Sequence, residues 1–463
     1  MAQISPVARH DRSTRMASLL AQRRFFVGFL AQVMQYGASL LLLPFLVKTL
    51  TTAEISVWYL LITIQGLAAI ADFGFGGAFA RGIATAFAGA DTIQTEGFNG
   101  RAAGNANYRL IGDLIHAARL WYAILAAIVF LVMITGGLAY VMSVTATSHL
   151  DAREIIVTWT IMALATAQSM YFSWVNPVLI GANRVEHDLI SQIIGKGGAA
   201  LLGIGVLLAG GGLLALAIAQ LAAFGSARII ATLFMRPIRR QIPSLTRDNA
   251  RSIRLLRTIA PNASRFGLAS LSGFLITRSS VFAVTSFVGL TEGGAYAISL
   301  QLISAILQVS QLPAQFAMPR LVSFQSQGAK RAVRREAIQL STLFVALFLL
   351  GVLALTFVAP PLFKMLGRNV ILLPAPLLFF LGVVMLLEGL HSVNAFVLMT
   401  GNKVPFTRAA VLSAIAVVAG TLFAGWCGWG IEGIIAVQGL VQLSYNNWRW
   451  PLMVLQDTRI VAP

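Results

Sequence analysis

Long apolar runs separated by polar stretches follow one another along the whole chain. Each run is about as long as the ~20 residues that an α-helix needs to cross the hydrocarbon core of a bilayer. The pattern predicts twelve membrane-spanning helices, at residues 25–47, 55–78, 120–143, 155–178, 189–209, 213–235, 266–288, 295–317, 340–359, 371–398, 405–425 and 431–448. The polar stretches are too short for a separate enzymatic domain, because about 40 residues cannot bury an adequate core.

The basic residues of the connections alternate between the two sides of the predicted membrane. Even-numbered connections hold most of them, whereas the odd-numbered connections hold only Lys48, Arg153, Lys364 and Arg368. Lys and Arg are enriched in cytoplasmic connections, so both termini are expected in the cytoplasm. The same bias accounts for the net charge of +18, and we therefore predict no nucleic-acid partner.

Composition narrows the class of protein further. Hydrophobic residues make up 57% of the chain and charged residues 11%, with a mean hydropathy of +0.80, which excludes a soluble domain and indicates an all-α polytopic membrane protein. Cys427 is the one cysteine, so the chain has neither an intramolecular disulfide nor a cysteine-rich metal site. The sequence has no metal-ligand spacing, nucleophile motif or phosphate-binding loop, and we predict that the protein is not an enzyme and has no cofactor or metal.

The two halves of the chain resemble each other weakly. Residues 46–51 match residues 286–291, and residues 181–185 match residues 400–404, at corresponding joins between spans. Each half has an even number of spans, so the repeat is parallel, as in transporters that bind substrate between their halves. We expect a basic cytoplasmic tail, an N-terminal six-helix bundle, a basic cytoplasmic linker, a C-terminal six-helix bundle and a cytoplasmic tail, at residues 1–23, 24–238, 239–261, 262–456 and 457–463.

Residues 71–82 end the second apolar run with an acid, several glycines and a base. Trp58, Gln65 and Asp72 recur every seven residues and share one helix face, which we expect to line an interior cavity. A carboxylate that faces lipid is costly, and glycines let the helix bend or another backbone approach closely. In the alternative interpretation, Asp72 only ends the helix at the water interface and Arg81 is an ordinary cytoplasmic anchor.

Polar side chains also form stripes within other spans. The eighth span carries four glutamines on one face, and such groups line a wet cavity or bond a neighbouring helix. Arg278, near the middle of the seventh span, is the one clearly central cation, and its forked donors suit a phosphate or carboxylate ligand. In the alternative, Arg278 forms a structural ion pair with Asp72 or Glu388. The predicted substrate-binding residues are Arg278, Gln301, Gln308, Gln311, Gln315, Asp72, Arg81 and Gln35.

The tenth span carries Glu388, His391 and Ser392 on one face, at i, i+3 and i+4. A carboxylate beside a histidine can relay protons or hold a cation, so Glu388 and His391 are the predicted coupling-ion residues. The alternative is that the pair bonds to another helix and never changes its charge.

The stretch at residues 72–81, Asp-Phe-Gly-Phe-Gly-Gly-Ala followed by Arg81, resembles the Asp-Leu-Gly-Leu-Gly segment in the second span of MOP (multidrug/oligosaccharidyl-lipid/polysaccharide) exporters, within the bacterial O-antigen and exopolysaccharide flippase branch. Residues 401–403, residues 319–320 and the duplicated twelve-span layout fit the same superfamily. The resemblance implies two six-helix bundles around a central cavity, located in the bacterial inner membrane. It also implies Arg24, Arg81, Arg265 and Arg320 as candidates for diphosphate binding at the inner mouth.

The same resemblance implies a function. A flippase of this branch moves an undecaprenyl-diphosphate-linked oligosaccharide from the cytoplasmic to the periplasmic leaflet by alternating access, in polysaccharide or lipopolysaccharide biosynthesis. Its expected partners are that lipid-linked substrate, the membrane lipids, and polysaccharide polymerase and chain-length proteins. Two alternatives remain open. A multidrug or cation antiporter of the same fold would use Asp72 and Glu388, whereas a polysaccharide polymerase or ligase would need a sizeable outer connection, and the predicted connections contain none.

Overall fold

The computed structural model describes residues 27–28, 30–35, 37–93, 105–242, 248–358, 360–361, 372–400 and 405–458, and all regular structure in these ranges is helical. Within them, ten helical segments are long and apolar enough to cross a membrane. Two further spans are each built from two shorter helices. Together they account for the twelve predicted spans and confirm the all-helical membrane fold.

The helices follow the chain in two sets. The N-terminal half contains the first helix (Leu30–Thr49), α2 (Thr52–Ile70), α3 (Phe75–Phe87), α4 (Tyr108–Val132), η1 (Met133–Gly137), α5 (Leu138–Thr145), α6 (Ala152–Tyr171), η2 (Phe172–Trp174), α7 (Val175–Gly181), α8 (Val185–Leu208), α9 (Leu213–Phe234) and α10 (Arg236–Arg239). The C-terminal half contains α11 (Asn249–Phe287), α12 (Leu290–Ser326), α13 (Lys330–Phe357), α15 (Ala375–Thr400), α16 (Thr407–Trp426), α17 (Gly430–Ser444) and α18 (Asn446–Asp457).

The second span is not the continuous helix that the sequence predicts at 55–78. α2 ends at Ile70 and α3 begins at Phe75, and the break between them contains Phe73 with φ 49° and Gly74 with φ 73°. A positive φ is uncommon for a residue with a side chain, so the break is a specific local structure rather than a gentle bend. Asp72 therefore lies between two helices and not inside one.

α11 begins earlier than the seventh predicted span, within the predicted linker at 239–261. The carboxylate of Asp248 accepts a hydrogen bond of 3.0 Å from the backbone N–H of Arg251, which caps the helix and lowers the pKa of Asp248. The guanidinium of Arg251 in turn lies 2.7 Å from the carboxylate of Asp113 on α4. The first turns of α11 thus pack against the N-terminal half, although the helix continues into the C-terminal half.

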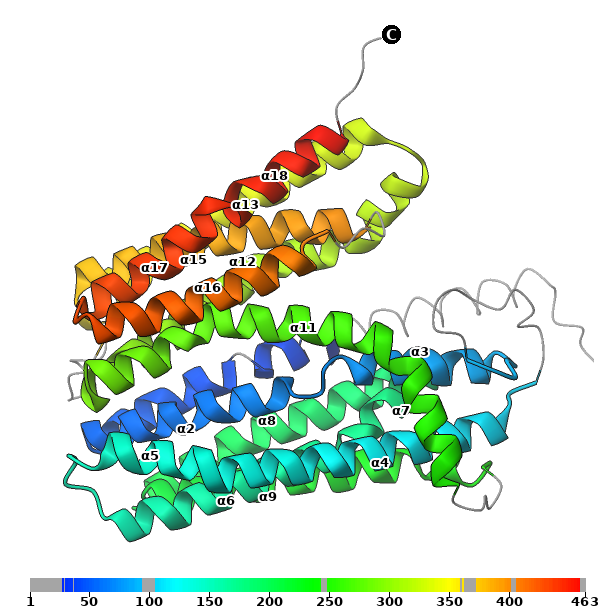
Figure 1. Ribbon diagram of the computed structural model, residues 1–463, viewed down its shortest axis with the longest axis horizontal. Coiled ribbons are helices and arrows are strands. Elements are labelled where there is room, and N and C mark those ends of the chain that lie inside the picture. Colours follow the sequence, from blue (N-terminus) through cyan, green and yellow to red (C-terminus); the bar gives the residue numbers. More distant parts are fainter. Residues whose placement is uncertain are drawn as a thin grey trace, which may run out of the picture.

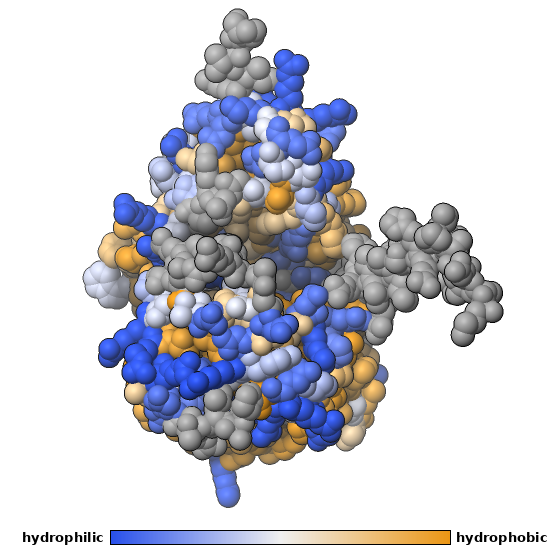
Figure 2. Space-filling model, turned by 90° about the vertical axis from the view of Figure 1, so that its right-hand side faces the viewer, coloured by the Kyte–Doolittle hydropathy of each residue, from blue (hydrophilic) through white to orange (hydrophobic). Residues whose placement is uncertain are grey.

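The two halves lie against each other at one end and diverge at the other (Figure 1). At the closed end, which holds the odd-numbered connections, Gly294 of α12 lies so close to Ser56 of α2 that a Cβ at position 294 would overlap the Ser56 side chain. The Tyr140 hydroxyl of α5 also donates to the carbonyl of Phe282 on α11, at 3.3 Å. One apolar core cluster spans both halves. Figure 2 looks onto the opposite end, where hydrophilic side chains gather.

Candidate functional site

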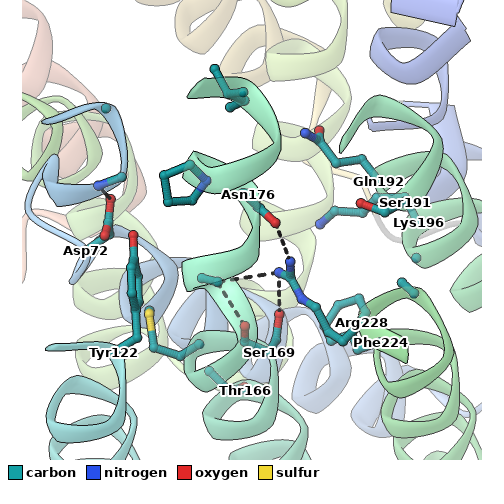
Figure 3. A pocket seen from close by; sticks show the side chains of 18 of the residues that line it. Asp72, Tyr122, Thr166, Ser169, Asn176, Ser191, Gln192, Lys196, Phe224 and Arg228 are labelled. Carbon is teal, nitrogen blue, oxygen red and sulfur yellow. Dashed lines mark hydrogen bonds between the residues drawn. The ribbon is translucent and has the colours of Figure 1, made fainter. Parts of the chain in front are cut away.

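A cavity of about 800 Å³ lies within the N-terminal half, among α2, α3, α4, α6, α7, α8 and α9 (Figure 3). Four charged residues line it: Asp72, Arg81, Lys196 and Arg228. Three of these are positive and one is negative, so the lining carries a net charge of +2. The other polar lining groups are neutral amides and hydroxyls, among them Gln65, Thr166, Ser169, Ser173, Asn176, Ser191 and Gln192.

Arg228 of α9 is held by neutral oxygens. Its Nη1 donates to Asn176 Oδ1 at 2.8 Å, and its Nη2 donates to Ser169 Oγ at 3.2 Å (Figure 3). These partners come from α6 and α7, the two parts of the fourth span, which a 3₁₀ turn joins just before Pro177. No carboxylate bonds to Arg228 among the described residues, so its hydrogen bonds orient the guanidinium without neutralising it. The buried carboxylate of Asp188 on α8 acts on Arg228 electrostatically from behind the cavity lining.

Lys196 lies midway along α8 and is exposed to the cavity. Its ammonium group lies 5.8 Å from the centre of the Phe224 ring, within range of a cation–π interaction. Glycines at positions 195, 197 and 198 leave the surrounding helix surface bare of side chains. A cation at this depth of a membrane helix requires water or an anionic ligand beside it.

Asp72 faces the same cavity from the break between α2 and α3. Its Oδ2 accepts the backbone N–H of Gly76 at 3.1 Å, at the positive end of the α3 dipole, and the Tyr122 hydroxyl donates to the same carboxylate. Its Oδ1 has no hydrogen-bond partner among the described residues. The expectation that Asp72 and Gln65 line an interior cavity is met, whereas Trp58, from the same predicted face, is buried in the apolar core.

The predicted substrate-binding residues do not form one group. Asp72 and Arg81 line the cavity, but Arg278, Gln35 and the four glutamines of α12 are not among its lining residues. Arg278 instead donates to Gln301 Oε1 at 3.3 Å and to Ser304 Oγ at 3.4 Å. Gln301 also donates to Ser39 Oγ of the first helix, at 3.2 Å, so this polar group links the two halves.

The remaining α12 glutamines vary in exposure. Gln311 is buried, whereas Gln308 and Gln315 are half-buried. Gln35, on the first helix, is exposed. The alternative in which Arg278 pairs with Asp72 or Glu388 has no counterpart among the ion pairs of the described residues, since the contacts of Arg278 are neutral.

Glu388 and His391 meet as predicted, in a separate place inside the C-terminal half. His391 Nε2 lies 3.6 Å from Glu388 Oε1, and Gln442 Nε2 donates to Glu388 Oε2 at 2.8 Å. His391 Nδ1 lies 3.0 Å from Asn447 Oδ1. Gln442 and Asn447 flank the break between α17 and α18, so the pair is anchored where the twelfth span loses its regular helix.

Two cations of the site were missed by the sequence interpretation. Lys196 lies inside the fifth span and Arg228 inside the sixth, and neither is among the candidate residues that the sequence indicated. The statement that Arg278 is the one central cation is therefore wrong. The signal that identified Arg278, a basic residue within an apolar run, would have found both. Arg24 and residues 401–403 lie outside the described residues, whereas Arg320 pairs with Glu336.

Comparison with known proteins relates this geometry to solved transporters. No family model matches the chain, and no curated protein matches it. The inward-facing conformation of a multidrug resistance MATE family transporter of the MOP superfamily matches with a TM-score of 0.64 and 11% identity, over 93% of this chain and 96% of that one. The outward-facing conformation of such a transporter matches with a TM-score of 0.56 and 12% identity, over 95% and 96%.

A third solved structure, a MOP superfamily transporter from Pyrococcus furiosus described by the reverse polarity of its binding pocket, matches with a TM-score of 0.55 and 13% identity, over 95% of this chain and 96% of that one. At such identities the likeness shows the fold alone. The likeness extends over nearly the whole of each chain. The protein is therefore a multi-pass integral membrane protein with the fold of the MOP superfamily transporters.

Proposed function

We propose that the protein is a flippase that moves a lipid-linked oligosaccharide with an anionic diphosphate from the cytoplasmic to the periplasmic leaflet by alternating access. The observation that carries this proposal is the net charge of +2 on the cavity of the N-terminal half. Cations that are oriented by neutral partners attract a diphosphate, and amides and hydroxyls suit the hydroxyl groups of sugars. A cavity for cationic drugs would need a lining with a net negative charge.

The direction of opening supports the same function. The halves diverge at the end that holds the even-numbered connections, which the distribution of Lys and Arg assigns to the cytoplasm. An opening there would admit a substrate from the cytoplasmic side. A cysteine introduced at Gln241 in a Cys427→Ser background should then be protected from an impermeant thiol reagent in intact cells, and one at Thr147 should be labelled. The reverse pattern would overturn the orientation.

Arg278 and the Glu388–His391 pair have proposed roles outside this cavity. Arg278 adds a cation bonded to neutral groups where the first helix meets α12, and it would contact the substrate when the halves rearrange. Glu388 and His391 would carry the coupling proton, because a carboxylate and an imidazole in contact can exchange one.

The experiment that tests the proposal compares the two cargo classes directly. The protein is placed in a strain that lacks its own polysaccharide flippase, and surface glycan is measured beside the efflux of a cationic dye. Restored glycan with unchanged dye efflux supports the flippase. Dye efflux without glycan would instead support a cation antiporter, the second candidate, which the unpartnered Oδ1 of Asp72 in the cavity favours.

A further inference from the structure

A second hollow, of about 590 Å³, lies beside the cavity at the open end of the molecule. It is a groove between the first turns of α11 and the pair α3 and α4. Its lining is apolar, with Phe75, Trp121, Leu256 and Ala260 among the residues that form it, apart from Arg257 and one serine. Arg257 is exposed, so the groove combines an apolar lining with a cation in contact with solvent.

The wall between the groove and the cavity is thin. Asp72 lines the cavity and the next residue, Phe73, lines the groove. In α4, Tyr122 lines the cavity and its neighbour Trp121 lines the groove. The rings of Trp121 and Phe75 stack at 4.0 Å between their centres and form part of this wall. A ligand in the cavity is thus separated from the groove by the thickness of single residues.

The groove lies at the level where lipid headgroups meet the acyl region. Trp121 precedes Thr145, the last residue of α5, by 24 residues, which is ~36 Å at a rise of 1.5 Å per residue. The hydrocarbon core is about 30 Å thick, so a span whose far end is Thr145 brings Trp121 to the opposite interface. Tryptophan is enriched at such interfaces, and the Nε1 of Trp121 has no hydrogen-bond acceptor among the described residues.

We infer that this groove holds the phosphate-proximal part of the apolar chain of the lipid-linked substrate while its diphosphate lies in the cavity. The inference rests on the proposed function. The head of such a substrate needs the wet, cationic cavity, whereas its chain must stay among apolar groups, so the molecule has to cross the cavity wall near the phosphates. The stacked Trp121 and Phe75 stand at that crossing, and Arg257 adds a cation on the groove side.

The test locates the apolar chain of the substrate and does not rely on affinity alone. An apolar chain that moves from lipid into an apolar groove gains no hydrophobic free energy, so its binding there would hardly change the affinity. The full-length protein in nanodiscs is photolabelled with geranylgeranyl diphosphate that bears a diazirine on the isoprene unit next to the phosphates. We expect adducts on the peptides that contain Trp121 and residues 253–264. Ala260→Trp, which fills the groove, should lower these adducts at least about tenfold, whereas Ala250→Trp, an exposed position on the same helix, should leave them unchanged.

The outcomes separate the groove from the cavity. If unlabelled geranylgeranyl diphosphate displaces the probe but the adducts lie elsewhere, or Ala260→Trp behaves as Ala250→Trp does, the groove inference is wrong and the diphosphate site stands. Ala260→Leu, a smaller change, serves where the tryptophan variant does not fold. A diazirine-bearing phosphatidylglycerol that labels the same peptides equally would mean that the groove holds bulk lipid. If no diphosphate probe is displaceable, both the inference and the proposed function fail.

Discussion

Replacing Arg228 tests the cationic cavity most directly. The side chain donates to Asn176 and Ser169, so binding of a diphosphate would exchange a neutral acceptor for an anionic oxygen. A hydrogen bond from Arg228 to a phosphate oxygen has two charged partners, and hydrogen bonds to charged groups contribute about 1.5–3 kcal/mol. The loss of this bond, together with the fall of the net charge of the lining from +2 to +1, predicts that Arg228→Gln weakens diphosphate binding at least about tenfold.

The assay is equilibrium binding of geranyl diphosphate to the purified protein in nanodiscs, repeated at several salt concentrations. Arg240→Gln is the matched control, because Arg240 is exposed and does not line the cavity. Arg228→Lys should bind the diphosphate with intermediate affinity, since an ammonium group keeps the positive charge but lacks the two parallel N–H donors of a guanidinium. Equal affinity and equal salt dependence for Arg228→Gln and Arg240→Gln would refute the assignment of the anion to this cavity.

Three further predictions concern other parts of the molecule. Gly267→Ala should lower the midpoint of thermal unfolding, because the added Cβ would collide with the backbone of Phe73, at a cost of about 1–3 kcal/mol. Gly273→Ala is the control, because a Cβ at position 273 would meet open space and should leave the midpoint unchanged. Equal midpoints for the two variants would show that the structure relieves the collision. Glu388→Gln should abolish transport driven by a pH gradient and keep substrate binding, and full gradient-driven transport would leave the residue a structural role. Arg278→Lys should reach the membrane but export surface glycan poorly, and Arg278→Ala should export none. Recovery of glycan export by Arg278→Ala combined with Glu388→Gln would instead identify a structural ion pair between the two residues.

The fold could be predicted from the sequence because a bilayer imposes one length and one composition on every span. The same reasoning could not find the charged cavity. A basic residue inside an apolar run signals a polar neighbourhood, yet which helices surround it depends on tertiary packing. Arg278, the residue that the sequence singled out, contacts α12, whereas Arg228 of α9 and Lys196 of α8 line one cavity together with Asp72 from the break between α2 and α3.

The local conformation of the break between α2 and α3 could not be predicted from the sequence either. The glycines of residues 71–82 indicated a bend, but one positive φ falls on Phe73, a residue type that does not favour it, where the backbone lies directly against Gly267 of α11. The neighbour of Glu388 on its own helix, His391, was predictable from spacing. Its second partner, Gln442, lies 54 residues away in sequence, and only the folded arrangement of α15 and α17 reveals it.

The close approach of Gly294 to Ser56 at the closed end has a consequence for the transport cycle. To expose the cavity to the opposite side of the membrane, the two halves must separate at this closed end. They must then form a new contact, a second seam, at the end that is open in this conformation. The free-energy difference between the two seams sets the fraction of molecules facing each way, and each 1.4 kcal/mol changes that ratio about tenfold. A side chain at position 294 would therefore act on turnover through the resting population, without touching the cargo, and its effect would be independent of which cargo is carried.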